Sequence, residues 1–130
     1  MPPDALALAN RYYSAIGAGS LEATTALFSP NFYKKTPRDR LLAGLKALRE
    51  HCGSATSHSV TATTILDDFT SEKIRANIQF TVTYDRCRSI EQMSIVKDGD
   101  AASEIDALAA HIDEVPQALP DLSKRSSTTT

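Results

Sequence analysis

The sequence predicts an α+β fold, with helices in the first half of the chain and an antiparallel sheet in the second. Over most of residues 4–52, apolar residues recur every three or four positions, which is typical of helices with one buried face. From residue 58 onward, apolar and polar residues alternate instead, which is typical of strands that bury one face. The 130 residues suit one domain, which we place at residues 1–119.

Two helices are expected to open the chain and to form a hairpin. The first begins at residues 2–4, where two prolines and an aspartate suit a first turn, and it ends at Gly17 and Gly19. Ser20 is a favourable cap for a second helix over residues 21–28, because its side chain can accept a hydrogen bond from a backbone N–H group of the first turn.

A short extended segment and a third helix follow. Residues 31–36 are rich in aromatic residues and stop at Pro37, which predicts a short strand. The third helix is expected over residues 38–52, where apolar residues at helical spacing mark one buried face. These residues are Leu41, Leu45, Leu48 and Cys52.

Four strands of an antiparallel meander account for the rest of the domain. They are expected over residues 58–67, 74–84, 88–97 and 103–113. The second has the clearest alternation, whereas the fourth is rich in alanine and would also suit a helix. A twisted sheet of this size should curl around the three helices as a cone with a cavity for a ligand. The Ser- and Thr-rich residues 120–130 predict a disordered tail.

Composition excludes several classes of function. The net charge is −2, from 14 basic and 16 acidic residues, so the chain lacks the basic field that nucleic acid binding requires. Its longest apolar runs are a few residues, far short of the roughly 20 that span a membrane. The first residues lack the basic and apolar regions of a secretory signal, which predicts a cytoplasmic location.

The two cysteines, Cys52 and Cys87, are expected to remain free thiols, because a soluble chain of this size needs no disulfide. Zinc binding is not expected, since the adjacent side chains of His51 and Cys52 should not converge on one metal ion. The sequence also contains no phosphate-binding loop, dinucleotide-binding glycines or nucleophile elbow, so we expect no metal and no cofactor.

Four stretches of the sequence, in order, resemble the nuclear-transport-factor-like superfamily. Residues 10–23 are similar to its first two helices, residues 28–32 to the start of its first strand, residues 42–48 to its third helix and residues 96–99 to its last hairpin. The superfamily includes ketosteroid isomerases, scytalone dehydratases, limonene epoxide hydrolases and SnoaL-like polyketide cyclases. Over residues 5–119, the resemblance implies a cone-shaped sheet around three helices and a function in converting or binding a small molecule.

His58 is the first candidate for acid or base catalysis. It opens a strand on the face expected for Val60, Ala62 and Leu66, and scytalone dehydratase-like proteins carry a catalytic histidine at a similar place. An imidazole with a pKa of about 6.5 can donate or accept a proton at physiological pH. The alternative is a histidine at the end of a strand that hydrogen-bonds a backbone carbonyl group.

Tyr12 and Gln92 correspond, by the resemblance, to two groups of ketosteroid isomerase. Tyr12 matches the tyrosine that donates a hydrogen bond to the developing oxyanion, although it could equally pack with its hydroxyl group at the surface. The catalytic base of the isomerase falls at Thr36, which cannot take a proton from carbon, so the isomerase reaction itself is not expected. The second oxyanion group falls at Gln92, which we expect to position a substrate or to be a buried amide.

A second proton carrier is expected near the end of the last strand. Asp113 lies where SnoaL-like cyclases carry an acid/base aspartate, and His111 shares its side of the strand. The alternatives are a solvated strand end, or an inward Asp106 if the strand is bulged or shifted by one residue. Tyr13, Phe80 and His111 are expected to contact the substrate.

Together these features predict a cofactor-independent enzyme that rearranges a small, apolar, oxygenated molecule by proton transfer. Cyclisation, isomerisation and dehydration all fit, and the resemblance implies polyketide or terpenoid biosynthesis. The alternative is a non-catalytic ligand-binding or dimerisation module of the same fold. In either case, the polar outer face of residues 74–84 is expected to pair two copies of the chain as a homodimer.

Overall fold

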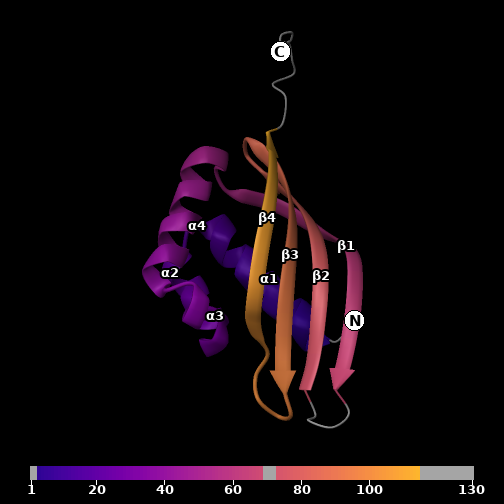
Figure 1. The fold of residues 1–130 in the computed structure, drawn as a ribbon. Coiled ribbons are helices and arrows are strands. Elements are labelled where there is room, and N and C mark those ends of the chain that lie inside the picture. Colours follow the sequence, from indigo (N-terminus) through magenta and orange to yellow (C-terminus); the bar gives the residue numbers. More distant parts are fainter. Residues whose placement is uncertain (1–2, 69–72, 115–130) are drawn as a thin grey trace.

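The computed structural model describes residues 3–68 and 73–114, and these residues form four α-helices and a four-stranded antiparallel sheet (Figure 1). The helical elements are α1 (Pro3–Ala18), α2 (Leu21–Thr24), the 3-10 turn η1 (Thr25–Leu27), α3 (Pro30–Lys35) and α4 (Arg38–Cys52). The strands are β1 (Ala55–Asp68), β2 (Lys73–Tyr84), β3 (Cys87–Asp98) and β4 (Glu104–Glu114). The predicted α+β class and the four predicted strands are confirmed.

The core lies between the helices and one face of the sheet, which we call the inner face. The strands form a meander in the order β1-β2-β3-β4, and α1 crosses behind them in Figure 1. The buried side chains of β2 define the inner face, and they are Ala76, Ile78, Phe80, Val82 and Tyr84. They join one core cluster with the buried residues of α1, which are Ala5, Leu8, Ala9, Tyr12, Tyr13 and Ile16. One-sided burial therefore explains the alternation seen in the sequence.

Residues 31–36 do not form the predicted strand, because most of them belong to helix α3. Ser29 caps this helix: its Oγ accepts a hydrogen bond from the backbone N–H of Phe32 at 3.1 Å, and Pro30 occupies the first turn. This favourable start outweighs the β preference of the aromatic side chains. The described residues thus form four helices where three were expected, and an isolated parallel bridge joins Phe28, just before α3, to Ile105 of β4.

β1 does not keep one face along its length, because its pairing with β2 shifts by one residue between Val60 and Ala62. Before the shift, His58 pairs with the buried Val82 and lies on the inner face. After the shift, Leu66 lies on the opposite, outer face and is 51% exposed. The predicted common face of His58, Val60, Ala62 and Leu66 is therefore wrong beyond Val60.

Cys52 and Cys87 form a disulfide, so the expectation of two free thiols is wrong. Cys52 ends α4 and Cys87 begins β3, with their Cα atoms 5.1 Å apart and both side chains buried. Backbone hydrogen bonds hold these ends together, from Arg86 N to Cys52 O at 2.9 Å and from Asp85 N to Ser54 O at 3.0 Å. The pairing depends on this contact between α4 and the β2–β3 turn, which a spacing of 35 residues does not reveal.

Two predictions concern the ends and the environment of the chain. In the part of the chain that the structure describes, no helix is long and apolar enough to cross a membrane. The predicted tail at residues 120–130 lies outside the described residues, as does the predicted domain end at residue 119. The domain boundary and the cytoplasmic location therefore stay predictions.

Asp106 connects the start of α3 to the sheet. Its Oδ1 accepts hydrogen bonds from Ser29 Oγ at 2.7 Å and Asn31 Nδ2 at 3.3 Å, and its Oδ2 accepts one from Arg75 at 3.0 Å. Burial alone would raise the pKa of Asp106, but these hydrogen bonds and the charge of Arg75 outweigh it and hold the pKa below its ordinary value. The carboxylate of Asp106, an alternative candidate for the cavity, is thus engaged in structural contacts.

Asp106→Asn should lower the free energy of unfolding at neutral pH by about 1–3 kcal/mol, because its hydrogen bonds lose a charged acceptor. The folded pKa lies below the unfolded value of about 3.9, so this stabilisation is complete above that pH and is lost as the pH falls towards the folded value. Denaturant unfolding between about pH 7 and about pH 3 measures the effect, with the exposed Asp113→Asn as control. A difference that persists unchanged at low pH would contradict this role.

Candidate functional site

A pocket of about 320 Å³ opens between α4 and the inner face of β3 and β4. Much of its wall is apolar, formed by Leu41, Leu45 and Leu48 from α4 and by Leu108, Ala110 and Ile112 from β4. This volume is at the lower end of the range of about 300–1,000 Å³ that small-molecule sites occupy. The pocket therefore suits a small, mostly apolar molecule.

A buried carboxylate, that of Glu91, lies in the wall of this pocket. The residue is 1% exposed and points to the inner face, because β3 alternates with Ser89, Glu91 and Met93 buried. The hydroxyl group of Tyr13 donates to Oε1 at 2.8 Å, and that of Tyr84 donates to Oε2 at 2.6 Å. These hydrogen bonds offset part of the cost of burying the carboxylate and fix its orientation.

Three tyrosines around Glu91 are held as neutral phenols. Burial raises the pKa of Tyr13 and the pKa of Tyr84 far above their ordinary value, and the charge of Glu91 raises both further. Tyr12 lines the pocket, and its pKa is raised by burial and then by the charge of Glu91. Since these phenols keep their protons, Glu91 is the member of this group that can accept one.

His58 packs against Tyr13 and is not part of the pocket wall. The two rings are stacked with centroids 4.5 Å apart, and His58 Nε2 lies 2.9 Å from Asn10 Oδ1. Burial lowers the pKa of His58, and the opposing effect of the Glu91 charge is smaller, so the neutral imidazole is favoured. The structure thus places His58 beside a partner of Glu91 rather than at the pocket.

The other residues expected at the site divide between the two faces of the sheet. Tyr12 lines the pocket, and Phe80 is fully buried with its ring centroid 5.2 Å from that of Tyr13. Gln92 is exposed on the outer face, because its neighbour Glu91 occupies the inner face. The acid that faces inward on β3 is therefore one residue before the position that the resemblance indicated.

His111 and Asp113 lie on the same side of β4, as predicted, with Nε2 and Oδ1 3.4 Å apart. The intervening residues Ala110 and Ile112 line the pocket, so this pair points away from it. Their side chains are 80% and 63% exposed, which matches the solvated strand end considered as the alternative. Neither side chain is placed to exchange a proton with a molecule in the pocket.

The sequence pattern contains a signal for Glu91 that the resemblance to ketosteroid isomerase does not use. Glu91 is in phase with Met93 and Ile95, which are buried along β3. An acid in phase with a buried apolar stripe needs hydrogen-bond partners and is a candidate for chemistry. The resemblance pointed to Gln92 instead, and a displacement of one residue exchanges the two faces of a strand.

A scan of protein-family models and a search of curated proteins found no match for the chain. The resemblance to the nuclear-transport-factor-like superfamily therefore stays a prediction. What the protein does is inferred from the residues and geometry of the site.

Tyr84→Phe should lower the free energy of unfolding by about 1.5–3 kcal/mol, because it removes a buried hydrogen bond to a charged acceptor. Tyr33→Phe is the matched control, since the Tyr33 hydroxyl donates to a neutral acceptor, the backbone carbonyl of Thr25, and its loss should cost only about 0.5–1.5 kcal/mol. Denaturant unfolding of the three proteins measures both values. Equal losses in the two variants would contradict a charged, buried Glu91.

Proposed function

We propose that the pocket binds a small, mostly apolar, oxygenated molecule and that Glu91 moves a proton on it without a cofactor. The observation that carries this proposal is a buried carboxylate, held by two tyrosines, in the wall of an apolar pocket. Isomerisation, cyclisation and dehydration each depend on such a proton transfer. The cone-shaped sheet and a place in polyketide or terpenoid biosynthesis, which the resemblance implies, belong to this proposal.

A purely structural role accounts less well for Glu91. Burying a charge costs free energy, and well-packed apolar residues in its place are often neutral or stabilising. A carboxylate that contacts a pocket is instead available to a bound molecule, in surroundings of low polarity where its electrostatic interactions are strong. Its presence there favours chemistry over packing.

Glu91 and Tyr12 take complementary roles in this scheme. Glu91 accepts a proton from a carbon atom of the ligand and returns it to a neighbouring atom, while Tyr12 donates a hydrogen bond to a ligand oxygen. Tyr13 and Tyr84 each occupy one lone pair of Glu91, which leaves other lone pairs for the ligand. His58 is a positioning residue that acts through its stack on Tyr13.

The second candidate function is a ligand-binding or dimerisation module without catalysis. Leu66 and Ile90 lie on the outer face of the sheet, 51% and 39% exposed, and a second copy of the chain would cover them. The homodimer through this face stays a prediction. It does not decide between the two functions, because the pocket lies on the inner face in both cases.

Catalysis is tested with 5-nitrobenzisoxazole, a flat apolar probe that opens when a base removes its C3 proton. The C–H and N–O bonds break, a nitrile forms, and the coloured product is 2-cyano-4-nitrophenolate. We expect the protein to accelerate this reaction with saturation, by at least about 100-fold over acetate at equal concentration. A rate no higher than that of acetate would contradict the enzymatic proposal and leave the binding module.

Two variants of Gly44 form a matched pair that tests whether this reaction takes place in the pocket. Gly44 lies in the wall of the pocket, and a Cβ atom added to it would meet no atom within 4 Å apart from its chain neighbours and the backbone of its own helix. Gly44→Leu should fill the pocket and lower kcat/KM by about tenfold or more, whereas Gly44→Ala should change it by no more than about twofold. Equal rates in the two variants would show that the probe reacts elsewhere.

A further inference from the structure

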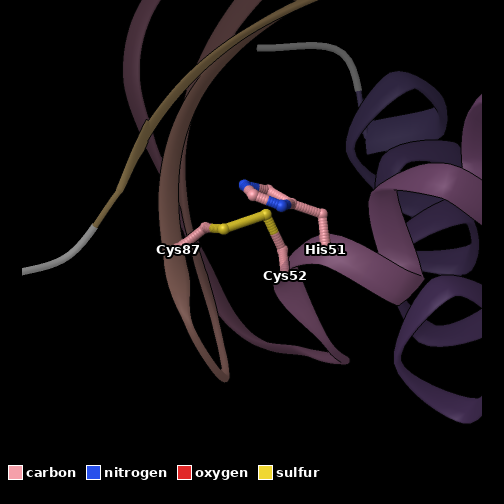
Figure 2. A group of neighbouring side chains, drawn as sticks. All are labelled: His51, Cys52 and Cys87. Atoms are coloured by element: carbon pink, nitrogen blue, oxygen red, sulfur yellow. A yellow bond between two sulfur atoms is a disulfide. The ribbon is translucent and has the colours of Figure 1, made fainter.

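We propose that reduction of the Cys52–Cys87 disulfide creates a zinc site formed by His51, Cys52 and Cys87. The ligand atoms of these three residues all lie within 4.8 Å of one another. Figure 2 shows the His51 ring beside the disulfide, at the Cys52 end of the S–S bond. The expectation that the side chains of His51 and Cys52 should not converge is therefore wrong, because their ligand atoms at the end of α4 lie within 4.8 Å of each other.

The three donor atoms are of the kind that zinc prefers. Thiolate sulfur and imidazole nitrogen bind Zn²⁺ at about 2.3 Å and about 2.0 Å, and two sulfurs with one nitrogen form a known type of three-ligand site with an open fourth position. Both cysteines are buried, whereas His51 is exposed. A cation can thus enter from the His51 side, and water can complete its coordination there.

The end of α4 is held in place by contacts other than the disulfide. Arg86 Nη2 donates to Glu50 O at 2.9 Å, Arg86 Nε donates to His51 O at 3.2 Å, and Arg86 N donates to Cys52 O at 2.9 Å. These hydrogen bonds fasten the last turn of the helix to the residue that precedes Cys87. Reduction therefore separates the two sulfurs without releasing the segments that carry the three ligands.

The proposed zinc site exists when both cysteines are reduced. A dithiol reductant gives two electrons and two protons to the disulfide, which becomes two thiols, while the reductant becomes a cyclic disulfide. Zn²⁺ then displaces both thiol protons and binds two thiolates and the neutral imidazole. Disulfides persist in oxidising compartments and are reduced in the cytosol, so the compartment would select between the cross-link and the metal site.

The test is a titration of the full chain with Co²⁺, which reports thiolate ligands by its charge-transfer absorption and four-coordination by its visible bands. A phosphine reduces the disulfide, because a thiol reductant would compete for the metal. We expect one Co²⁺ per reduced chain, displaced by one Zn²⁺, and no such bands with the oxidised protein. His51→Ala should weaken binding by at least about tenfold, whereas His111→Ala on β4 should leave it unchanged.

Two results would overturn the proposal. One is a reduced protein without thiolate–cobalt bands, and the other is a His51→Ala variant that binds Co²⁺ as tightly as the unchanged chain. Far-ultraviolet circular dichroism, recorded during the titration, shows whether the reduced chain has lost its fold. In that event one equivalent of Zn²⁺ should restore the spectrum of the oxidised protein, and failure to do so would equally contradict the site.

Discussion

Glu91→Gln lowers kcat/KM for 5-nitrobenzisoxazole by at least about 100-fold, because general-base catalysis contributes about 10²–10⁴ in rate and an amide has no basic oxygen. Glutamine preserves the volume of the side chain. Its NH₂ group cannot accept from a phenol, so either Tyr13 or Tyr84 loses its acceptor, at a cost of about 1–3 kcal/mol in stability. Rates are therefore measured at a temperature where thermal unfolding shows both proteins to be folded.

Glu22→Gln is the control for this experiment, since Glu22 is an exposed carboxylate on α2 and its removal should leave the rate unchanged. Glu91→Asp keeps the carboxylate but withdraws it from the pocket by one methylene group, so an intermediate rate is expected. A Glu91→Gln protein that is folded and retains the full rate would remove Glu91 from the mechanism.

Removing the disulfide should have the largest effect on stability. A cross-link between residues separated by 35 positions restricts the unfolded chain, and Cys52→Ala with Cys87→Ala should lower the free energy of unfolding by about 3–4 kcal/mol. Alanine is preferred to serine, because both positions are buried and a hydroxyl group there would need a hydrogen-bond partner. Denaturant unfolding measures the difference.

The oxidised protein treated with a phosphine in the absence of metal is the matching control for the double variant. It should lose a similar amount of stability, because it loses the same restriction on the unfolded chain. A loss below about 1 kcal/mol in both samples would show that the cross-link contributes little. The disulfide would then not stabilise the fold, and only the proposed metal site would give the two cysteines a role.

The sheet was predictable from the sequence, because one-sided burial leaves a period of two in each strand. In β2, where the alternation is clearest, Ala76, Ile78, Phe80, Val82 and Tyr84 are all buried. The helix α3 was not predicted, because the cap formed by Ser29 and Pro30 outweighs the strand preference of Phe32 and Tyr33. Local hydrogen bonding decides such short segments more than composition does.

The candidate site was predictable only in part, for reasons of register and long-range contact. Tyr12 and Tyr13 follow from the helical period of α1, and both contribute to the group around Glu91. Gln92 and Asp113 face outward, since each lies one residue away from an inward position. The disulfide depends on the packing of α4 against the β2–β3 turn, which leaves no period in the sequence.

A crystal structure with 5-nitrobenzotriazole tests the central claim most directly, because this compound carries an N–H group where the probe carries its reactive C–H group. The ring should lie between Leu45 and Leu108, with its N–H donating to an oxygen of Glu91 at about 2.6–3.2 Å. A benzotriazole bound elsewhere, for example beside Asp4 and Lys97 at the start of α1, would contradict the assignment of Glu91 as the proton-carrying group.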